Sequence, residues 1–553
     1  MARSPLFGLV RRAMKIAASA EATGTPIDEL FERAERRAWS RREMLGTSLL
    51  TAGGLWIAGC NSSPQPAPPS QAATPSAPAG AAPTGPRVAI VGGGVAGLNC
   101  AYQLKRGGIR ATVYEASDRT GGRMFTAENL MGQGLFTELG GEFIDSDHKD
   151  ILGLIKEFNL ETIDLAAPST PAVRKDTFFF NGQHMTQAQL VRAVSPLVAR
   201  IAADYDKLDD LIDFEHEGGA KKLDQMNITQ YLDKIGARGW IRELLEVAYL
   251  TEYGLECEDQ SALNLVFLID RDPKEDGFTM FGESDERYKV RGGNERVVKE
   301  LATRLDGQLQ TQHVLEAIRA RDQGFVLTFR NANGSAVDVD ADHAVLALPF
   351  TMLREVKIDV PLPDWKRRAI NELGYGTDAK VFAAFSRRRW RELGYSGAVY
   401  SDEPYQLAWD NAQFQPGDAT GITFYMGGKR GIAAGEGTAE EAARRLLPGF
   451  ERTFPGSSQY LTGKYSRFHW PTHQFTKAGY SAFKVGQWTT IAGSEGRSVG
   501  NLHFAGEHCS YDSQGYMNGG AETGRKAAEA VIAGLSEKKA ARMYVAAREA
   551  LAS

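Results

Sequence analysis

The sequence predicts an α/β fold, because a β-branched strand, a glycine-rich turn, a helix and a second strand follow one another. Residues 87–91 form a short apolar run that is typical of a buried parallel strand. The segment 92–97 has the pattern Gly-x-Gly-x-x-Gly and leads into a helical stretch over 98–106. Residues 111–114 predict the second strand, which ends at Glu115. This unit is typical of a Rossmann-like dinucleotide-binding domain.

Each glycine of the turn suits a dinucleotide ligand. Gly92 permits the tight turn, and Gly94 lets the backbone approach a pyrophosphate beside the free N–H groups of the helix N-terminus. Gly97 allows the helix to pack closely against the strand. Glu115 is placed to accept hydrogen bonds from a ribose, and a carboxylate there favours a free 2′-hydroxyl. The unit therefore predicts NAD or FAD rather than NADP.

The composition sets limits on the class of protein. The chain has 553 residues, of which 42% are hydrophobic and 24% charged, enough apolar material for a sizeable core. A mean hydropathy of -0.32 excludes a polytopic membrane protein. A formal charge of -5 gives no basic excess of the kind that binds nucleic acid. Four cysteines in so long a chain do not form a disulfide scaffold.

The N-terminal segment 1–60 is predicted to be an export signal. Arg41 and Arg42 precede an uncharged stretch that runs from Met44 to Gly59, which resembles a twin-arginine signal, and Cys60 ends a lipoprotein-like cleavage sequence. Residues 61–86 are rich in proline, alanine and serine and predict an extended linker. The expected location is periplasmic, or membrane-anchored through a lipidated Cys60.

Glycine-rich segments far along the chain favour FAD, because an extended FAD molecule needs a second set of contacts remote from the first. Gly121-Gly122-Arg123 follows the second strand. Residues 502–507 predict a strand and a turn, and residues 519–524 are expected to open the last helix of the fold. The positive N-terminal end of that helix would stabilise the electron-rich edge of a reduced flavin.

Taken together, these segments resemble the flavin-containing amine oxidases, a family that includes monoamine, polyamine and L-amino-acid oxidases and tryptophan monooxygenases. The resemblance covers about residues 87 to 532. The motifs that carry it are the glycine pattern at 92–97, Gly121-Gly122-Arg123, Glu138-Leu139-Gly140-Gly141-Glu142-Phe143, Gly292-Gly293-Asn294, Ala347-Leu348-Pro349, and Phe504-Ala505-Gly506-Glu507 followed by Gly515-Tyr516-Met517.

The resemblance implies two domains, with an α+β substrate-binding part inserted into a discontinuous FAD-binding domain. The expected FAD-binding segments are 87–149, 281–354 and 491–535. The expected substrate-binding segments are 150–280 and 355–490, and residues 536–553 form a C-terminal helix or tail.

The resemblance also implies which residues bind the cofactor. Some members of the family link a cysteine covalently to the flavin, and Gly479 occupies the matching position here, so FAD is expected to bind non-covalently. The implied FAD-binding residues are Gly92, Gly94, Ala96, Gly97, Glu115, Ala116, Gly122, Arg123, Gly140, Gly141, Glu142, Val314, Gly506, Glu507, Gly515, Tyr516 and Met517.

Four further residues match positions near the reacting centre in the family. Lys380 matches a lysine that holds a water beside the flavin, and a lysine buried there would be able to give up its proton by desolvation. Tyr480 and Tyr516 match a pair of aromatic rings that hold an amine in front of the flavin. Trp470 is expected to lie near the flavin.

The identity of the substrate stays open at this level. The arginine with which amino-acid oxidases bind a substrate carboxylate is missing from residues 140–145, although Arg287 or Arg291 could supply one. Glu142 and Asp145 could instead attract a second cationic group, which favours polyamines or a basic amino acid; the alternative is that they are solvated loop acids.

The predicted reaction is FAD-dependent oxidation of a primary or secondary amine, namely a polyamine, a monoamine or a basic amino acid, to an imine. Water would hydrolyse the imine to a carbonyl compound and ammonia or an amine, and oxygen would be reduced to hydrogen peroxide unless another acceptor takes the electrons. The alternatives are an L-amino-acid oxidase, a tryptophan-type monooxygenase, and a flavin-containing binding or isomerising protein without net oxidation. No metal site is predicted, because the nine histidines form no His-Glu-x-x-His motif and Pro471 separates His469 from His473. The oligomeric state is not predicted.

Overall fold

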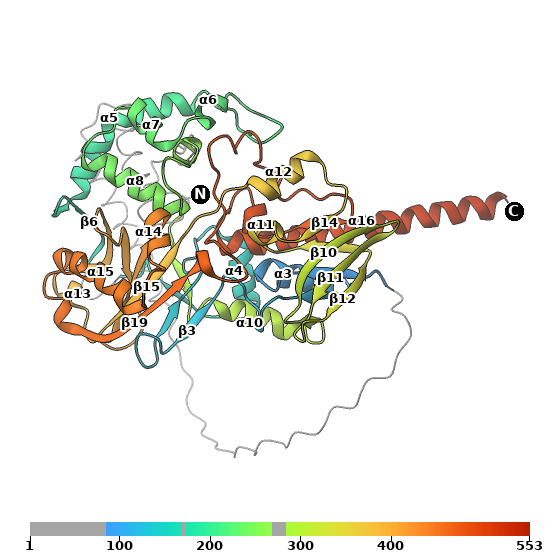
Figure 1. Cartoon of the computed structure of the whole chain (residues 1–553), viewed down its shortest axis with the longest axis horizontal. Coiled ribbons are helices and arrows are strands. Elements are labelled where there is room, and N and C mark those ends of the chain that lie inside the picture. Colours follow the sequence, from blue (N-terminus) through green and yellow to red (C-terminus); the bar gives the residue numbers. More distant parts are fainter. Residues whose placement is uncertain (1–84, 169–172, 268–283, 553) are drawn as a thin grey trace, which may run out of the picture.

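The computed structural model describes residues 85–168, 173–267 and 284–552. Apart from Gly85 and Pro86, the predicted signal and linker segments lie outside these residues. Within the described ranges, no helix combines the length and the apolar character that crossing a membrane requires. In Figure 1, helices and strands from early, middle and late parts of the sequence lie together, as the blue, yellow and red elements around α3 (Val95–Arg106) and α16 (Met517–Ala552) show.

A five-stranded parallel sheet forms the centre of one half of the molecule. Every neighbouring pair is parallel, in the order β20-β13-β1-β2-β9. The predicted strands at 87–91 and 111–114 are both present in it, and the α/β class expected from the sequence is confirmed. Its strands are β1 (Val88–Val91), β2 (Ala111–Tyr114), β9 (Leu309–Gln310), β13 (His343–Leu346) and β20 (Leu502–Phe504).

The strand β1 is buried on both faces, as its run of apolar residues predicts. Val88 and Ile90 belong to one hydrophobic core, while Ala89 and Val91 belong to another. Because successive side chains of a strand point to opposite faces, this one strand joins the two cores that enclose the sheet. The glycine turn is thereby anchored at the middle of the fold.

Close backbone packing explains two of the glycines around this sheet. A Cβ on Gly97 would stand 1.9 Å from the carbonyl oxygen of Gly92, and one on Gly524 would stand 2.2 Å from that of Ala96. The first glycine lets helix α3 (Val95–Arg106) lie against the turn after β1, and the second lets α16 (Met517–Ala552) pack against α3. Two helices that lie more than 400 residues apart in the chain, α3 and the start of α16, therefore pack against each other.

A smaller four-stranded sheet lies beside the parallel one, in the order β12-β11-β10-β14. Its last strand, β14, pairs with β10 although the predicted boundary at 354/355 assigns it to the substrate-binding part. The strands are β10 (Val314–Arg321), β11 (Gly324–Arg330), β12 (Ala336–Ala341) and β14 (Lys357–Asp359).

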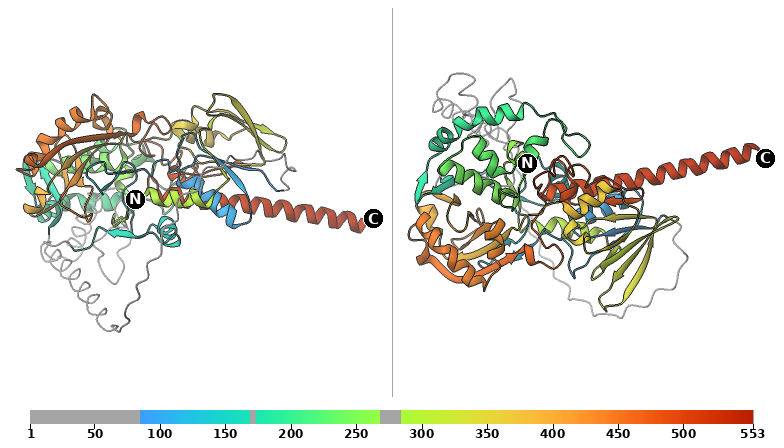
Figure 2. Two further views of the ribbon diagram at one scale, coloured as in Figure 1. Left: turned by 90° about the horizontal axis from the view of Figure 1, so that it is seen from below. Right: turned by 45° about the horizontal axis from the view of Figure 1, so that its top comes forward.

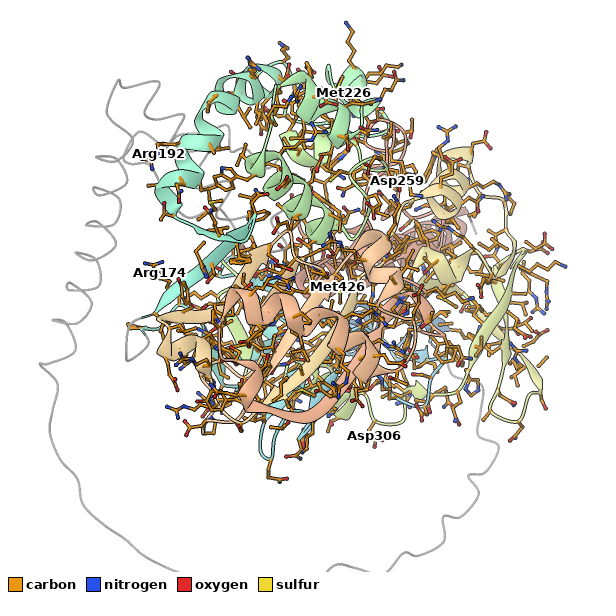
Figure 3. The ribbon with its side chains drawn as sticks, turned by 60° about the vertical axis from the view of Figure 1, so that its left-hand side comes forward. Arg174, Arg192, Met226, Asp259, Asp306 and Met426 are labelled. Atoms are coloured by element: carbon orange, nitrogen blue, oxygen red, sulfur yellow. The ribbon has the colours of Figure 1, made fainter. Side chains whose placement is uncertain are left out.

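The other half of the molecule contains a seven-stranded sheet with helices on both faces: α5 (Gln187–Tyr205) and α8 (Trp240–Tyr253) belong to the core on one face, and α15 (Ala439–Thr453) belongs to the core on the other. Its strand order is β19-β15-β18-β17-β16-β6-β7, and its strands come from two separate stretches of sequence. Figure 3, in which Met226 and Met426 are labelled, looks onto this half and shows one group of helices above the sheet near Met226 and another group across the strands near Met426. The strands are β6 (Arg174–Phe180), β7 (Gln183–Met185), β15 (Ala379–Phe385), β16 (Tyr395–Ser401), β17 (Leu407–Asp410), β18 (Thr420–Met426) and β19 (Leu461–His469).

Short elements complete the two halves. Two two-stranded sheets pair β3 (Thr126–Glu128) with β4 (Phe136–Glu138) and β5 (Thr162–Asp164) with β8 (Tyr288–Val290). The remaining helices are α4 (Lys149–Glu157), α5 (Gln187–Tyr205), α6 (Lys221–Asp224), α7 (Ile228–Lys234), α8 (Trp240–Tyr253), α9 (Leu263–Val266), α10 (Glu295–Arg304), α11 (Phe350–Leu353), α12 (Asp364–Glu372), α13 (Arg389–Glu392), α14 (Gly428–Ala433), α15 (Ala439–Thr453), η1 (Ser458–Tyr460), η2 (Trp470–Thr472) and η3 (Glu507–Cys509).

The C-terminal helix starts slightly earlier than predicted and continues into the segment predicted as a C-terminal helix or tail. It begins at Met517, two residues before the predicted start at Gly519, and continues without a break through the predicted boundary at 535/536. The views in Figures 1 and 2 agree that its last turns extend away from the rest of the molecule. Its first turns, by contrast, lie against α3 and the segment before it, close to the glycine turn.

Candidate functional site

One cavity of about 810 Å³ brings the predicted site residues together. Its wall is built from the turn after β1, the segment after β2, the start of β10, and loops before and after β20. Of the predicted FAD-binding residues and the four residues expected near the reacting centre, only Gly97 does not line it, because it packs against Gly92 instead. The predicted residues in the wall are Gly92, Gly94, Ala96, Glu115, Ala116, Gly122, Arg123, Gly140, Gly141, Glu142, Val314, Lys380, Trp470, Tyr480, Gly506, Glu507, Gly515, Tyr516 and Met517.

The glycine turn leaves open space at the N-terminus of α3. Gly94 is the N-cap of this helix, and no side chain caps the free N–H groups of its first turn. A Cβ built on Gly94 would meet no protein atom within 4 Å and would project into the cavity. The position thus offers unpaired donors, a helix dipole and room for a ligand, which together fit a pyrophosphate.

Glu115 lies at the end of β2, beside the same turn. Its carboxylate accepts hydrogen bonds from the backbone N–H of Gly93 at 2.6 Å and from the backbone and hydroxyl of Ser117 at 2.8 and 2.9 Å. These three donors fix the carboxylate at the cavity wall. The position suits the ribose contact that the sequence predicts.

Arg123 and Glu507 join the two glycine-rich segments in the middle of the cavity. Arg123 donates to the carbonyl oxygen of Gly479 and to Glu507, in both cases at 2.8 Å. The Glu507 carboxylate also accepts from the hydroxyl of Ser481 and the backbone N–H of Gly515, each at 2.8 Å. One ion pair thereby holds four separate stretches of chain around the cavity.

Lys380, on β15, has an acceptor for each of its three N–H bonds. Its Nζ lies 3.1 Å from the carbonyl oxygen of Glu138, 2.9 Å from that of Gly140 and 2.8 Å from a carboxylate oxygen of Glu142. Three acceptors are the number that a lysine ammonium can satisfy, so this side chain is fully hydrogen-bonded although it is buried. The loss of its proton expected from desolvation stays a prediction.

Glu142 is held by two lysines and an indole. Besides Lys380, its carboxylate accepts from Lys289 at 2.8 Å and from Nε1 of Trp409 at 2.9 Å. Burial alone would raise the pKa of Glu142, but the two lysines outweigh it and hold that pKa below its usual value. Both carboxylate oxygens are thus occupied, which argues against the predicted attraction of a substrate cation by Glu142.

Asp145 does not line the cavity either. It is buried, accepts from the backbone N–H of Glu286 at 2.8 Å and lies 3.4 Å from Nε2 of His148. Burial raises the pKa of Asp145 to about 7 and lowers that of His148 to about 3. The carboxyl of Asp145 therefore organises the loop rather than facing a substrate.

Aromatic side chains form an aromatic wall in the same cavity as Lys380. Tyr480 and Tyr516 both line the cavity, as predicted. The hydroxyl of Tyr480 lies 2.7 Å from that of Tyr425 and donates to the carbonyl oxygen of Thr251 at 3.1 Å, while the hydroxyl of Tyr516 lies 3.2 Å from that of Ser284. With their polar tips bonded to the protein, the rings are held as apolar surfaces. Further aromatic residues of the wall are Phe143, Trp409 and Tyr425.

Trp470 closes another part of the cavity. It is buried, and its Nε1 donates to the carbonyl oxygen of Leu139 at 3.0 Å. Its ring contacts Phe468 and His473, with ring centres 4.5 and 5.2 Å away. These contacts fix its orientation in the cavity wall, where the sequence placed it.

The arginines weighed as carboxylate ligands face elsewhere. Arg287 pairs with Asp164 at 2.8 Å, and Arg291 pairs with Glu161 at 3.0 Å. Neither lines the cavity in the described part of the chain. The arginines that do are Arg119, bonded to the carbonyl oxygen of Gly122, Arg123, bonded to Glu507, and Arg330, paired with Glu316.

Sequence reasoning missed several residues of the site. Lys289 follows Tyr288 on β8, and no motif marks it, although it lies just before Gly292-Gly293-Asn294. Trp409 and Tyr425 come from adjacent strands of the seven-stranded sheet. Asp378, two residues before Lys380, also lines the cavity, beside Tyr480. For Asp378, its closeness in sequence to Lys380 could have indicated a place in the site; the sequence offered no such indication for Trp409 or Tyr425.

Comparison with known proteins agrees with this geometry. Residues 95–532 match the family described as flavin containing amine oxidoreductase. The chain belongs to this family. It is consequently an FAD-dependent amine oxidoreductase, as the sequence motifs predicted, and the open cradle at Gly94 fits the FAD that the family uses.

Individual relatives cover most of the chain at low identity. An L-amino acid dehydrogenase of Synechocystis is 23% identical over 463 residues, which are 80% of this chain and 94% of the relative. The solved structure of cyclohexylamine oxidase from Brevibacterium oxydans has a TM-score of 0.71 at 22% identity and covers 82% of this chain and 99% of its own. Putrescine oxidase bound to putrescine has a TM-score of 0.68 at 22% identity, with coverages of 81% and 99%. At these identities the two structures establish the shared fold.

Proposed function

We propose that this protein oxidises a primary or secondary amine to an imine, which water hydrolyses to a carbonyl compound and ammonia or a smaller amine. Bound FAD supplies the two-electron oxidation. In each turnover the amine loses two electrons and two protons, and oxygen that accepts them becomes hydrogen peroxide. The glycine turn, Glu115 and the Arg123–Glu507 pair would hold the dinucleotide.

The observation that carries this proposal is the set of aromatic side chains that line the same cavity as Lys380. Rings such as Tyr480 and Tyr516, whose hydroxyls are already bonded, offer apolar faces to a small organic amine. While protonated, Lys380 disfavours a second positive charge nearby, which favours the unprotonated amine that the oxidation requires. The similarity to putrescine and cyclohexylamine oxidases supports an amine as the substrate.

An α-amino acid is the second candidate substrate, since a Synechocystis relative is named an L-amino acid dehydrogenase. A substrate carboxylate would need a cationic partner. Within the described part of the chain, each arginine of the cavity wall already bonds to a protein acceptor. This arrangement favours amines over amino acids.

A substrate panel tests the proposal. Purified holoprotein should bleach its flavin under anaerobic conditions with at least one of putrescine, spermidine, cyclohexylamine and tyramine, and release peroxide with the same compound in air. Turnover confined to α-amino acids would replace the amine proposal with the amino-acid one. An amide product without peroxide would indicate a monooxygenase, and no bleaching by any compound would indicate a protein without net oxidation. Reduction of a dye in place of oxygen would identify a dehydrogenase.

We also propose export of the folded protein, based on Arg41, Arg42 and the apolar stretch that ends at Cys60. Replacing both arginines by lysine should retain the protein in the cytoplasm, as measured by cell fractionation. Replacing Cys60 by serine should release it from the membrane fraction if this cysteine carries a lipid. Unchanged fractionation of both variants would contradict the proposal.

A further inference from the structure

A buried cluster of three charged side chains lies at the cavity wall: Glu142 and Lys380 line the cavity, and Lys289, which does not line it, is bonded to Glu142. The Glu142 carboxylate lies between Lys289 and Lys380, 2.8 Å from the Nζ atom of each lysine. The three side chains are only 3–6% exposed. Lys289 also donates to the carbonyl oxygen of Asn411 at 3.2 Å, and Trp409 donates to Glu142. The cluster is therefore fixed by hydrogen bonds on every member.

The charges of this cluster do not cancel. While both lysines are protonated, two ammonium groups and one carboxylate leave an excess of one positive charge, in a place where charges are costly to bury. Glu138 is a further buried acid near the cluster, but its carboxyl accepts from the backbone N–H of Asn294 at 2.7 Å and from the hydroxyl of Thr126 at 2.8 Å rather than from either lysine. Burial raises the pKa of Glu138 to about 7, which makes this carboxyl a weaker counter-ion than Glu142.

An excess positive charge in a cavity wall stabilises negative charge on the ligand beside it. FAD gains electrons during the reaction, so the charge acts more strongly on its reduced form than on its oxidised form. A single lysine paired with Glu142 would be neutral overall. The second lysine, Lys289, supplies the excess positive charge of the cluster.

We propose that Lys289 is a positioning residue that acts through Glu142: it keeps this carboxylate and Lys380 in place and raises the reduction potential of the bound FAD. The proposal deepens the function proposed above and rests on FAD being bound in this cavity. It assigns a role to a lysine that lies 147 residues from Glu142 in sequence. Lys289 reaches no reacting atom itself in this arrangement, because its donors go to Glu142 and Asn411.

The charge count gives predictions of opposite sign for two variants. Lys289→Met removes one positive charge and leaves a neutral pair, so the equilibrium constant for FAD reduction should fall at least tenfold, about 30 mV for two electrons. Glu142→Gln removes the negative charge, so the same constant should rise by a similar factor. The double variant restores the original sum of charges, and its potential should return to within about 10 mV of the wild type.

The measurement is an anaerobic redox titration of the holoprotein at pH 6 against a reference dye. It needs no amine, so a failure of the proposed substrate class would leave its result intact. Lys484→Met, at an exposed position outside the cavity, is the matched control and should leave the potential unchanged. If Lys289→Met does not retain FAD, Lys289→Gln removes the same charge while keeping a donor for Glu142.

The expected pattern distinguishes charge from packing. Damage to packing alone would move both single variants in one direction, and the double variant further in that direction. Two results would overturn the proposal. One is a shift of the same sign in Lys289→Met and Glu142→Gln. The other is a change of less than twofold in the equilibrium constant for FAD reduction in the Lys289 variants.

Discussion

Arg123 and Glu507 lie 384 residues apart in the chain and form an ion pair, with 2.8 Å between Nη1 and Oε1. Since Glu507 also accepts from Ser481 and Gly515, its carboxylate connects the N-terminal glycine segments with the C-terminal ones. The two halves of the dinucleotide site are thus held by one buried carboxylate. This explains why a motif near residue 122 and one near residue 507 occur in the same protein.

Glu507→Gln should weaken this connection while keeping the shape of the side chain. Loss of a charged partner of a hydrogen bond costs about 2 kcal/mol of unfolding free energy. We expect that loss in urea unfolding of the holoprotein, together with weaker FAD retention. Glu529→Gln is the control, because Glu529 is 59% exposed and its pair with Arg525 should contribute less than about 0.5 kcal/mol. Equal losses in the two variants would contradict the connecting role.

The sequence was most informative where backbone geometry fixes the residue. Gly92, Gly94 and Gly97 could be interpreted from spacing alone, because a tight turn and a close helix contact exclude a side chain at Gly92 and Gly97, and an open cradle leaves room for a ligand at Gly94. The parallel strands on either side followed from the same unit. Such local requirements leave a pattern that a single sequence reveals.

Partners brought together by the inserted segments could not be predicted in this way. Arg287 and Arg291 looked suitable for the site but pair with Asp164 and Glu161. Lys289, between them, reaches Glu142 instead. Which of three neighbouring cations turns toward Glu142 depends on how β8 pairs with β5 and the loop before α4, and spacing does not encode that.

Gly94→Ala should block FAD binding without harming the fold. The added methyl group meets no protein atom within 4 Å, but it occupies the cradle that the pyrophosphate needs. We expect FAD affinity to fall at least tenfold, about 1.4 kcal/mol, with an unchanged melting temperature of the apoprotein. Gly153→Ala is the matched control, since its methyl group also meets no protein atom but lies on the exposed side of α4. If Gly94→Ala retains full FAD occupancy, the pyrophosphate does not lie there.

Lys380→Met should slow the reduction of bound FAD by an amine about 100-fold, the usual scale for loss of a group that assists proton movement. FAD should stay bound, because the contacts of Lys380 go to Glu138, Gly140 and Glu142. Stopped-flow absorbance under anaerobic conditions measures the rate. An unaltered rate would remove Lys380 from the mechanism, and loss of FAD would show that its role is structural.

Tyr480 offers a test of the aromatic wall that separates its ring from its hydroxyl. Tyr480→Phe loses the hydrogen bonds to Tyr425 and Thr251 but keeps the ring, so kcat/KM should fall less than about fivefold. Tyr480→Leu loses the ring as well, and kcat/KM should fall a further tenfold or so. Equal kinetic constants for the two variants would show that the substrate does not use the ring.

Glu495 should make stability depend on pH, because burial raises the pKa of its carboxyl to about 8. A carboxyl whose pKa is higher in the folded state stabilises the protein fully below its unfolded pKa, near 4.5, and loses this contribution as pH rises toward about 8. From pH 5.5 to 7.5 the expected loss is about 1.4 kcal/mol per pH unit. Glu495→Gln lacks this loss, so its melting temperature should rise relative to the wild type across that window.

The control for this prediction is Glu128→Gln, because Glu128 is exposed. If the melting temperatures of the wild type and of Glu495→Gln change equally with pH between 5.5 and 7.5, Glu495 is already ionised at pH 5.5.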